Sequence, residues 1–190
     1  DERISEFVTR RFVGSYLPGK TNAIEFDEGT GVLVPQGHRL SMQFHYVTNG
    51  QSAVDETQFG LYFSDEPNLK ERLTYAVASR FLLPPNANDF ELQAEQKVEQ
   101  GIIVTGVRAR MNFRGKRMKF VVENPEGLTR ELFSVPSYNY GWQPDYLLDE
   151  AEPVAAGSTL RVIGAFDNSL SNPSNPDPDK EVTFGLESWE

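Results

Sequence analysis

Short segments in which apolar and polar residues alternate recur along this chain, and residues that favour turns separate them. In residues 40–47 a large apolar side chain stands at every second position from Leu40 to Tyr46, and Asn49-Gly50 follows. Period-two alternation is typical of a half-buried β-strand, and Asn-Gly is typical of a tight turn. The same reasoning predicts strands at 40–47, 57–64, 73–83, 90–98, 101–112, 118–124, 130–135, 142–148, 159–167 and 182–188.

Many short strands at intervals of about 8–12 residues predict an all-β fold, either an antiparallel β-sandwich or a jelly roll. Helical periodicity is weak, because only residues 1–12 could hold a turn or two and residues 91–99 are ambiguous. Pro84 and Pro85 cannot donate hydrogen bonds to a neighbouring strand. We therefore expect a sheet to end at Leu83 and a seam in the fold at 83–86.

The chain has 190 residues, enough for one large or two small domains, and a net charge of −10. This charge argues against nucleic acid and anionic membranes as partners, because binding phosphate requires clustered Lys and Arg. The lack of cysteine excludes disulfides, thiolate metal sites and a cysteine nucleophile. No apolar run approaches the roughly 20 residues of a membrane-spanning helix. The start at Asp1 indicates processing, or a cut from a longer chain.

One basic stretch, residues 108–119 (RARMNFRGKRMK), departs from this acidic composition. Basic and apolar residues alternate in it, which favours a strand with one solvated face. A site for an anion or an acidic partner is the alternative interpretation.

Residues 167–180 (DNSLSNPSNPDPDK) read as a long loop, because prolines prevent regular pairing and Asn and Asp side chains bond to nearby backbone. Asp167, Asp177 and Asp179 could offer oxygen ligands to calcium, with carbonyls from Asn172 and Asn175. The spacing does not match an EF-hand, and turns initiated by Asn and Asp explain the same composition.

Candidate catalytic and binding residues are few. The chain has two histidines, His38 in an expected turn and His45 in an expected strand, and two cannot supply a site of three nitrogen ligands. No nucleophile elbow, phosphate loop, zinc-binding helix or dinucleotide fingerprint is present. Tyr138, Tyr140 and Trp142 form an aromatic cluster, either half core and half sheet surface or a surface that binds a sugar or a partner.

Taken in order, several of these segments resemble the copper type II, ascorbate-dependent monooxygenase family in its bacterial branch. Residues 34–63 resemble its Pro-x-Gly, strand, His-Tyr, Asn-Gly, strand signature, and residues 83–86 resemble the start of its second domain. Residues 135–148, 167–178 and 185–190 resemble further landmarks of the bacterial members. The resemblance implies two antiparallel jelly-roll domains, with 1–83 the C-terminal part of the first and 84–190 the second: one complete sandwich plus part of another.

Members of that family hold one copper on each domain, one for electron transfer and one for C–H hydroxylation. By resemblance, His45 matches a ligand of the electron-transfer copper. The His-x-His pair of the catalytic copper falls within residues 109–116 (ARMNFRGK), where Arg110 and Asn112 stand instead. A guanidinium repels a metal cation and an amide is a poor copper ligand, so the catalytic site is predicted to be degenerate. Arg110 could instead bind a carboxylate.

These inferences lead us to expect a monooxygenase-like module that has lost its catalytic copper. It would serve a structural or binding role in a larger extracytoplasmic (periplasmic or secreted) protein, with other protein chains or domains as partners. No cofactor is expected, with copper at His45 or calcium at the 167–180 loop as alternatives. Two other functions stay open: an active copper- and ascorbate-dependent monooxygenase completed by another chain, and a calcium- or carbohydrate-binding β-sandwich.

Overall fold

The computed structural model describes residues 12–16, 23–44, 46, 49–185 and 188–189. The chain divides into two compact units. Among the described residues, the smaller unit comprises 12–14 and 23–74, and the larger unit comprises 15–16 and 75–185 with 188–189. The domain boundary expected from the sequence at 83–84 stays a prediction.

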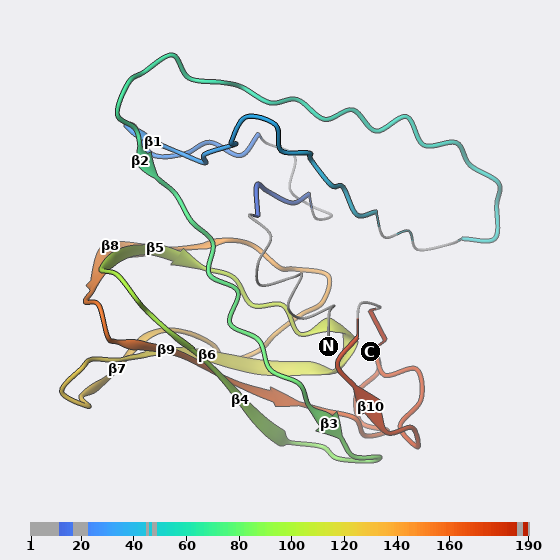
Figure 1. Ribbon diagram of the computed structural model, residues 1–190. Coiled ribbons are helices and arrows are strands. Elements are labelled where there is room, and N and C mark those ends of the chain that lie inside the picture. The colour runs from blue at the N-terminus through green and yellow to red at the C-terminus, as the bar shows by residue number, and fades with distance from the viewer. Residues whose placement is uncertain (1–11, 17–22, 45, 47–48, 186–187, 190) are drawn as a thin grey trace. The chain divides into compact units, whose positions relative to one another are not determined.

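The regular secondary structure of the larger unit consists almost entirely of antiparallel strands (Figure 1). One sheet has four strands in the order β4-β9-β6-β7, a second pairs β5 with β8, and a short ladder pairs β10 with β3. A single turn of 3₁₀ helix, Asn112–Arg114, precedes β6. The strands are β3 (Leu82–Leu83), β4 (Phe90–Lys97), β5 (Ile102–Val107), β6 (Gly115–Glu123), β7 (Thr129–Val135), β8 (Tyr146–Val154), β9 (Thr159–Phe166) and β10 (Val182–Thr183).

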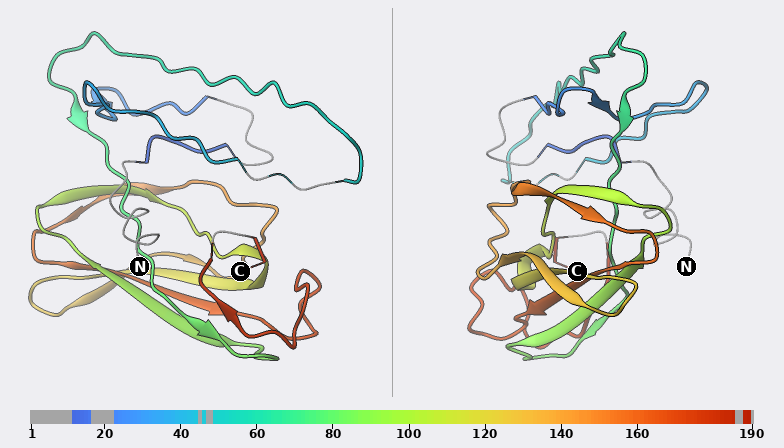
Figure 2. Two further views of the ribbon diagram at one scale, coloured as in Figure 1. Left: turned by 45° about the vertical axis from the view of Figure 1, so that its right-hand side comes forward. Right: turned by 90° about the vertical axis from the view of Figure 1, so that its left-hand side faces the viewer.

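The core of this unit lies between the four-stranded sheet and the β5-β8 pair (Figure 2). Near one end, Val122 of β6 packs with Val154 of β8. Near the other, Phe120 of β6 packs with Val107 of β5 and Tyr146 of β8. Because the two sheets bury apolar side chains against each other, the fold is an antiparallel β-sandwich, as the sequence predicts. The finer jelly-roll connectivity stays a prediction.

The segment that the sequence leaves ambiguous, residues 91–99, is mostly strand β4. Buried or half-buried residues alternate along it with exposed ones. On its exposed face the Glu95 carboxylate accepts a hydrogen bond of 2.6 Å from Arg161, the residue directly opposite on β9. Arg161 also bonds Glu123 at 3.0 Å. Pairing with β9 on one side and burial on the other fix this segment as a strand.

The smaller unit departs most from the sequence prediction. Its only described ladder is a parallel pair of two-residue strands, β1 (Thr30–Gly31) and β2 (Lys70–Glu71). The strands predicted at 40–47 and 57–64 are wrong for the residues that the structure describes, since these make no ladder. Among the described residues, the strands predicted at 73–83 and 182–188 are reduced to β3 and β10 of the larger unit. Alternation favours an extended backbone, but a strand also requires a neighbour to bond with.

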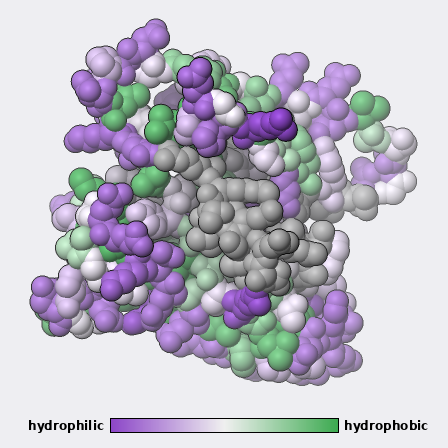
Figure 3. Space-filling view, in the orientation of Figure 1, coloured by the Kyte–Doolittle hydropathy of each residue, from purple (hydrophilic) through white to green (hydrophobic). Residues whose placement is uncertain are grey.

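The surface mixes polar and apolar residues, and the face in Figure 3 shows apolar side chains in separate groups among hydrophilic ones. No helix among the described residues is both long enough and apolar enough to cross a membrane.

Candidate functional site

The connection from β5 to β6 contains the positions where the resemblance places metal ligands. Side chains alternate along it: Ala109 and Met111 are buried at 2% and 4% exposure, whereas Arg110 between them is exposed. At Asn112 the backbone turns left-handed, with a φ of 56°, and the 3₁₀ turn begins. Asn tolerates this conformation better than most residues, which gives Asn112 a local structural role.

Tyr138, which follows β7 in the chain, lies against this connection. Its hydroxyl accepts a hydrogen bond of 3.2 Å from the Met111 amide, and its own amide donates to the Lys116 carbonyl at 2.8 Å. Burial raises the pKa of the Tyr138 phenol to about 12, against smaller opposing effects from the Met111 amide hydrogen bond and the nearby Arg110 charge. Gly115 makes room for the ring, because a Cβ there would lie 2.6 Å from Tyr138 and would also overlap Met111.

Arg110 is distinctive within the basic stretch. Three other basic residues of the stretch form ion pairs with carboxylates. Arg108 pairs with Asp145, and Lys116–Asp89 and Lys119–Glu131 each have a nitrogen–oxygen distance of 3.2 Å. Arg110 has no ion pair within the part of the chain that the structure describes. The stretch is therefore mostly an ion-paired surface, and with respect to the described residues Arg110 is its one exposed guanidinium without a carboxylate partner.

Arg114, which the sequence does not single out, is 4% exposed and has neutral contact partners. Its Nε donates to Asn168 Oδ1 at 2.7 Å, and its terminal nitrogens donate to the carbonyls of Trp189 and Asp177. Burial lowers the pKa of Arg114, and the charge of Asp177 partly offsets this. A buried guanidinium needs all these acceptors, because removing a charge from water is costly.

Asn168 is fully buried and organises the 167–180 loop. Its Nδ2 donates to the carbonyls of Pro84 and Lys180, both at 2.9 Å, and its Oδ1 accepts from Arg114 and from Asn175. The sequence gives one signal for this role: an Asn directly after a strand and before a proline-rich loop is placed to bond with backbone.

The three candidate calcium ligands are engaged in local hydrogen bonds. Asp167 accepts from the amide and hydroxyl of Ser169, Asp177 accepts from the Asp179 amide at 3.1 Å, and Asp179 accepts from Asn86 at 3.1 Å. Within the described ranges no three residues of His, Cys, Asp or Glu lie together as a metal site. The arrangement matches the expected turns, and it gives the calcium interpretation no support.

The aromatic cluster is divided between core and surface. Tyr138 packs on the second core cluster, and Tyr140 is half-buried, edge-on to Phe113 with ring centroids 4.4 Å apart. The Tyr140 hydroxyl shares a hydrogen bond of 2.7 Å with Ser188. Trp142 is 62% exposed, so of the three predicted surface residues it presents the largest aromatic area to a ligand or partner.

Of the two histidines, the structure describes only His38. His38 is exposed in the expected turn, where its amide donates to the Pro35 carbonyl at 3.2 Å and Gly37 has a φ of 82°. His45, the candidate residual copper ligand, lies outside the described residues.

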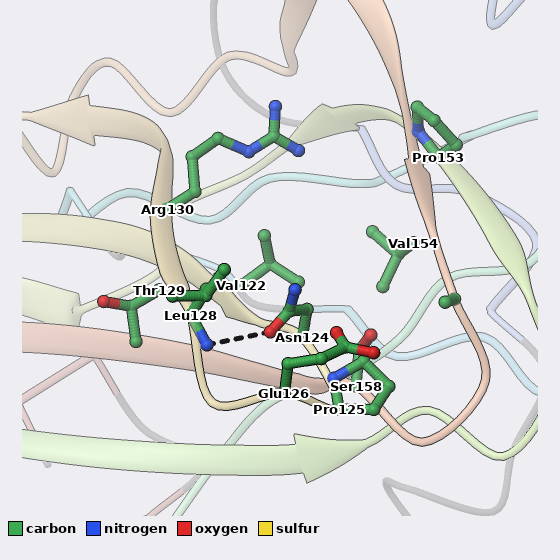
Figure 4. A pocket seen from close by; sticks show the side chains of 11 residues that line it. Val122, Asn124, Pro125, Glu126, Leu128, Thr129, Arg130, Pro153, Val154 and Ser158 are labelled. Carbon is green, nitrogen blue, oxygen red and sulfur yellow. Dashed lines mark hydrogen bonds between the residues drawn. The ribbon is translucent and has the colours of Figure 1, made fainter.

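A hollow of about 540 Å³ lies at the end of the sandwich that carries the β6-β7 turn (Figure 4). Apolar side chains such as Val122 and Val154 line it beside Glu126, Arg130 and Ser158. The Leu128 amide donates to Asn124 Oδ1 at 2.8 Å and closes the turn at its rim. None of the residues that the sequence singles out lines this hollow.

The class of protein that the fold defines is an antiparallel β-sandwich. Comparison with protein-family models, with curated proteins and with solved structures gives no match for this chain. The monooxygenase resemblance therefore depends on the sequence segments given above.

Proposed function

We propose that this chain is a non-catalytic, copper-monooxygenase-like β-sandwich module with a structural or binding role in a larger extracytoplasmic protein. The observation that carries the proposal is the exposed Arg110 guanidinium, which has no carboxylate partner among the described residues. It stands where the resemblance requires the first imidazole of a copper-binding pair.

The charge of Arg110 opposes metal binding in addition to the lost ligand. At 4 Å, a unit positive charge repels a divalent cation by about 2 kcal/mol even with the dielectric constant of water. That repulsion alone weakens binding by more than tenfold, since about 1.4 kcal/mol corresponds to a factor of ten. A neutral imidazole carries no such penalty and donates a lone pair.

The surroundings of Arg110 support the same proposal. Met111, the thioether-bearing residue of the segment, is buried, and its amide donates a hydrogen bond to the Tyr138 hydroxyl. Asn112 occupies a left-handed backbone position that suits an amide side chain. The segment is thus adapted to packing and turn formation, which is consistent with a module retained for its fold.

Copper loading followed by metal analysis tests the proposal. We expect less than a tenth of an equivalent of copper bound after removal of excess metal. The double variant Arg110→His, Asn112→His should gain copper affinity by at least tenfold, because it removes the charge and restores two nitrogen donors. The matched control is Arg110→Gln, which removes the charge without adding an imidazole and should gain much less.

Other results would support the alternatives. A full equivalent of copper in the unaltered chain, with ascorbate-driven turnover, would replace the proposal with an active monooxygenase. Stoichiometric calcium that raises the melting temperature would indicate a calcium-binding module instead. If the double histidine variant gains no affinity over its control, the assignment of residues 109–116 to the copper segment is wrong.

A further inference from the structure

Two segments of the smaller unit are extended and make no ladder. Within 39–44 and 52–66, the described backbone makes no backbone–backbone hydrogen bond with other described residues. Figures 1 and 2 draw them as the two limbs of one long loop without a strand arrow. Two of their amides, those of Thr57 and Glu66, donate to the side chains of Asp55 and Ser64. The remaining amides and carbonyls have no hydrogen bond to another described residue, so they can pair with another strand.

Each segment carries a stripe of exposed apolar side chains. In the first segment (39–44) these are Leu40, Met42 and Phe44, and in the second (52–66) they include Phe59, Leu61 and Phe63, all between 39% and 78% exposed. The rings of Phe44 and Tyr46 stack with centroids 6.2 Å apart and an interplanar angle of 8°. Residues two apart thus share one face, as in a strand.

The charges of the two segments are also complementary. Residues 40–54 and 57–64 contain no Asp, Glu, Lys, Arg or Pro. Arg39 precedes the first stripe, and Asp65 with Glu66 follow the second. Extended segments of high β propensity without charge or proline pair readily with another strand. In an antiparallel arrangement, the basic start of one segment meets the acidic end of the other.

We propose that this chain associates with a second copy of itself, the first segment of each copy pairing antiparallel with the second segment of the other. The register that aligns both stripes places Phe44 opposite Phe59. Leu40 then faces Phe63, Met42 faces Leu61, and His38 lies opposite Asp65. A two-fold axis repeats this ladder, so that both segments of both copies are paired.

The exposed area is sufficient for such an association. At roughly 150–250 Å² per aromatic side chain, the exposed parts of Phe44, Tyr46, Phe59 and Phe63 offer about 500 Å² on each copy. A stable interface buries about 800 Å² per partner, and Leu40, Met42 and Leu61 supply the remainder. A second copy is favoured over an unlike partner because the two stripes match each other in length, spacing and flanking charge.

Cysteine cross-linking tests the register, since the chain has no cysteine of its own. Gln43 and Gly60 lie opposite each other in the proposed ladder, and a side chain at Gly60 meets no atom closer than 4.0 Å. Mixing the single variants Gln43→Cys and Gly60→Cys under mild oxidation should yield a disulfide-linked dimer. The control mixture of Gln43→Cys with Leu170→Cys, which is 84% exposed in the larger unit, should not.

Association is measured independently by light scattering after size exclusion at about 10–100 µM protein. The mass of two chains is expected, with at least a hundredfold weaker association in Phe44→Lys and in Phe59→Lys and no change in Leu170→Lys. A monomer throughout this range overturns the proposal. So does a Gln43→Cys, Gly60→Cys double variant that cross-links only within one chain. This inference does not depend on the proposed function. Copper binding tests the proposed function, whereas the molar mass in solution tests the association.

Discussion

Replacing Asn168 with alanine should destabilise the larger unit more than any other single loop substitution that removes only polar contacts. Asn168 is fully buried and makes four hydrogen bonds, two from Nδ2 to the carbonyls of Pro84 and Lys180 and two to Oδ1. Alanine would leave two carbonyls, the Arg114 guanidinium and the Asn175 amide without these partners.

The magnitude follows from the kind of bond lost. The hydrogen bond from the charged Arg114 contributes about 1.5–3 kcal/mol, and each of the three neutral ones contributes about 1 kcal/mol. The expected loss is therefore about 5 kcal/mol, a large fraction of the 5–15 kcal/mol that holds a typical domain folded. With a guanidinium chloride slope of about 4 kcal/mol per molar, the unfolding midpoint should fall by about 1 M.

Tryptophan fluorescence during guanidinium unfolding is a suitable assay, because both tryptophans, Trp142 and Trp189, belong to the larger unit. Asn139→Ala is the matched control: its side chain is exposed and accepts from the Gly141 amide at 2.8 Å, so its loss should cost less than about 1 kcal/mol. A double-mutant cycle with Arg114→Met should give a coupling energy of at least about 1 kcal/mol. If the guanidinium midpoint of Asn168→Ala lies within about 0.2 M of the midpoint of the unaltered protein, the reasoning is refuted.

Two further predictions concern the Tyr138 side of the candidate site. Gly115→Ala should cost about 1–3 kcal/mol in the same assay, because the new Cβ overlaps Met111 and the Tyr138 ring, whereas Gly101→Ala, with no atom closer than 3.7 Å, should cost less than half as much. The folded pKa of Tyr138, about 12, lies above its ordinary value of 10.0, so its contribution to stability is complete below pH 10 and is lost as the pH rises through 12. Between pH 10 and 12 the unfolding midpoint should therefore fall, and Tyr138→Phe should reduce this fall; equal slopes for both proteins would contradict the assignment.

Much of the larger unit could be predicted from local pattern. Strands β4, β6, β7 and β9 fall within a few residues of the predicted ranges. In β4 the pattern is clearest, because buried or half-buried residues alternate with exposed ones along its length. Strand β8 begins at Tyr146 and continues to Val154, later than predicted. The aromatic residues before it suggest a strand, but a bend and the Asn139–Trp142 bridge interrupt the chain there.

The candidate site was only partly predictable. Arg110 and Asn112 were identified through the resemblance, and the structure adds that Arg110 is exposed while Asn112 is left-handed. Arg114 and Asn168 could not be paired in advance, since 54 residues separate them in the chain and neither belongs to a local motif that requires the other. Their bond depends on the adjacency of β6 and β9, from which the two residues extend.

The sequence by itself determined the all-β class, the positions of most turns and the exclusion of thiolate chemistry, because alternation, turn residues and composition are local properties. Tertiary structure decided which extended segments became strands. Residues 90–97 found a partner in β9, whereas the equally regular alternation at 40–44 found none among the described residues. A strand is completed by hydrogen bonds from a neighbour, and no local pattern specifies where that neighbour lies.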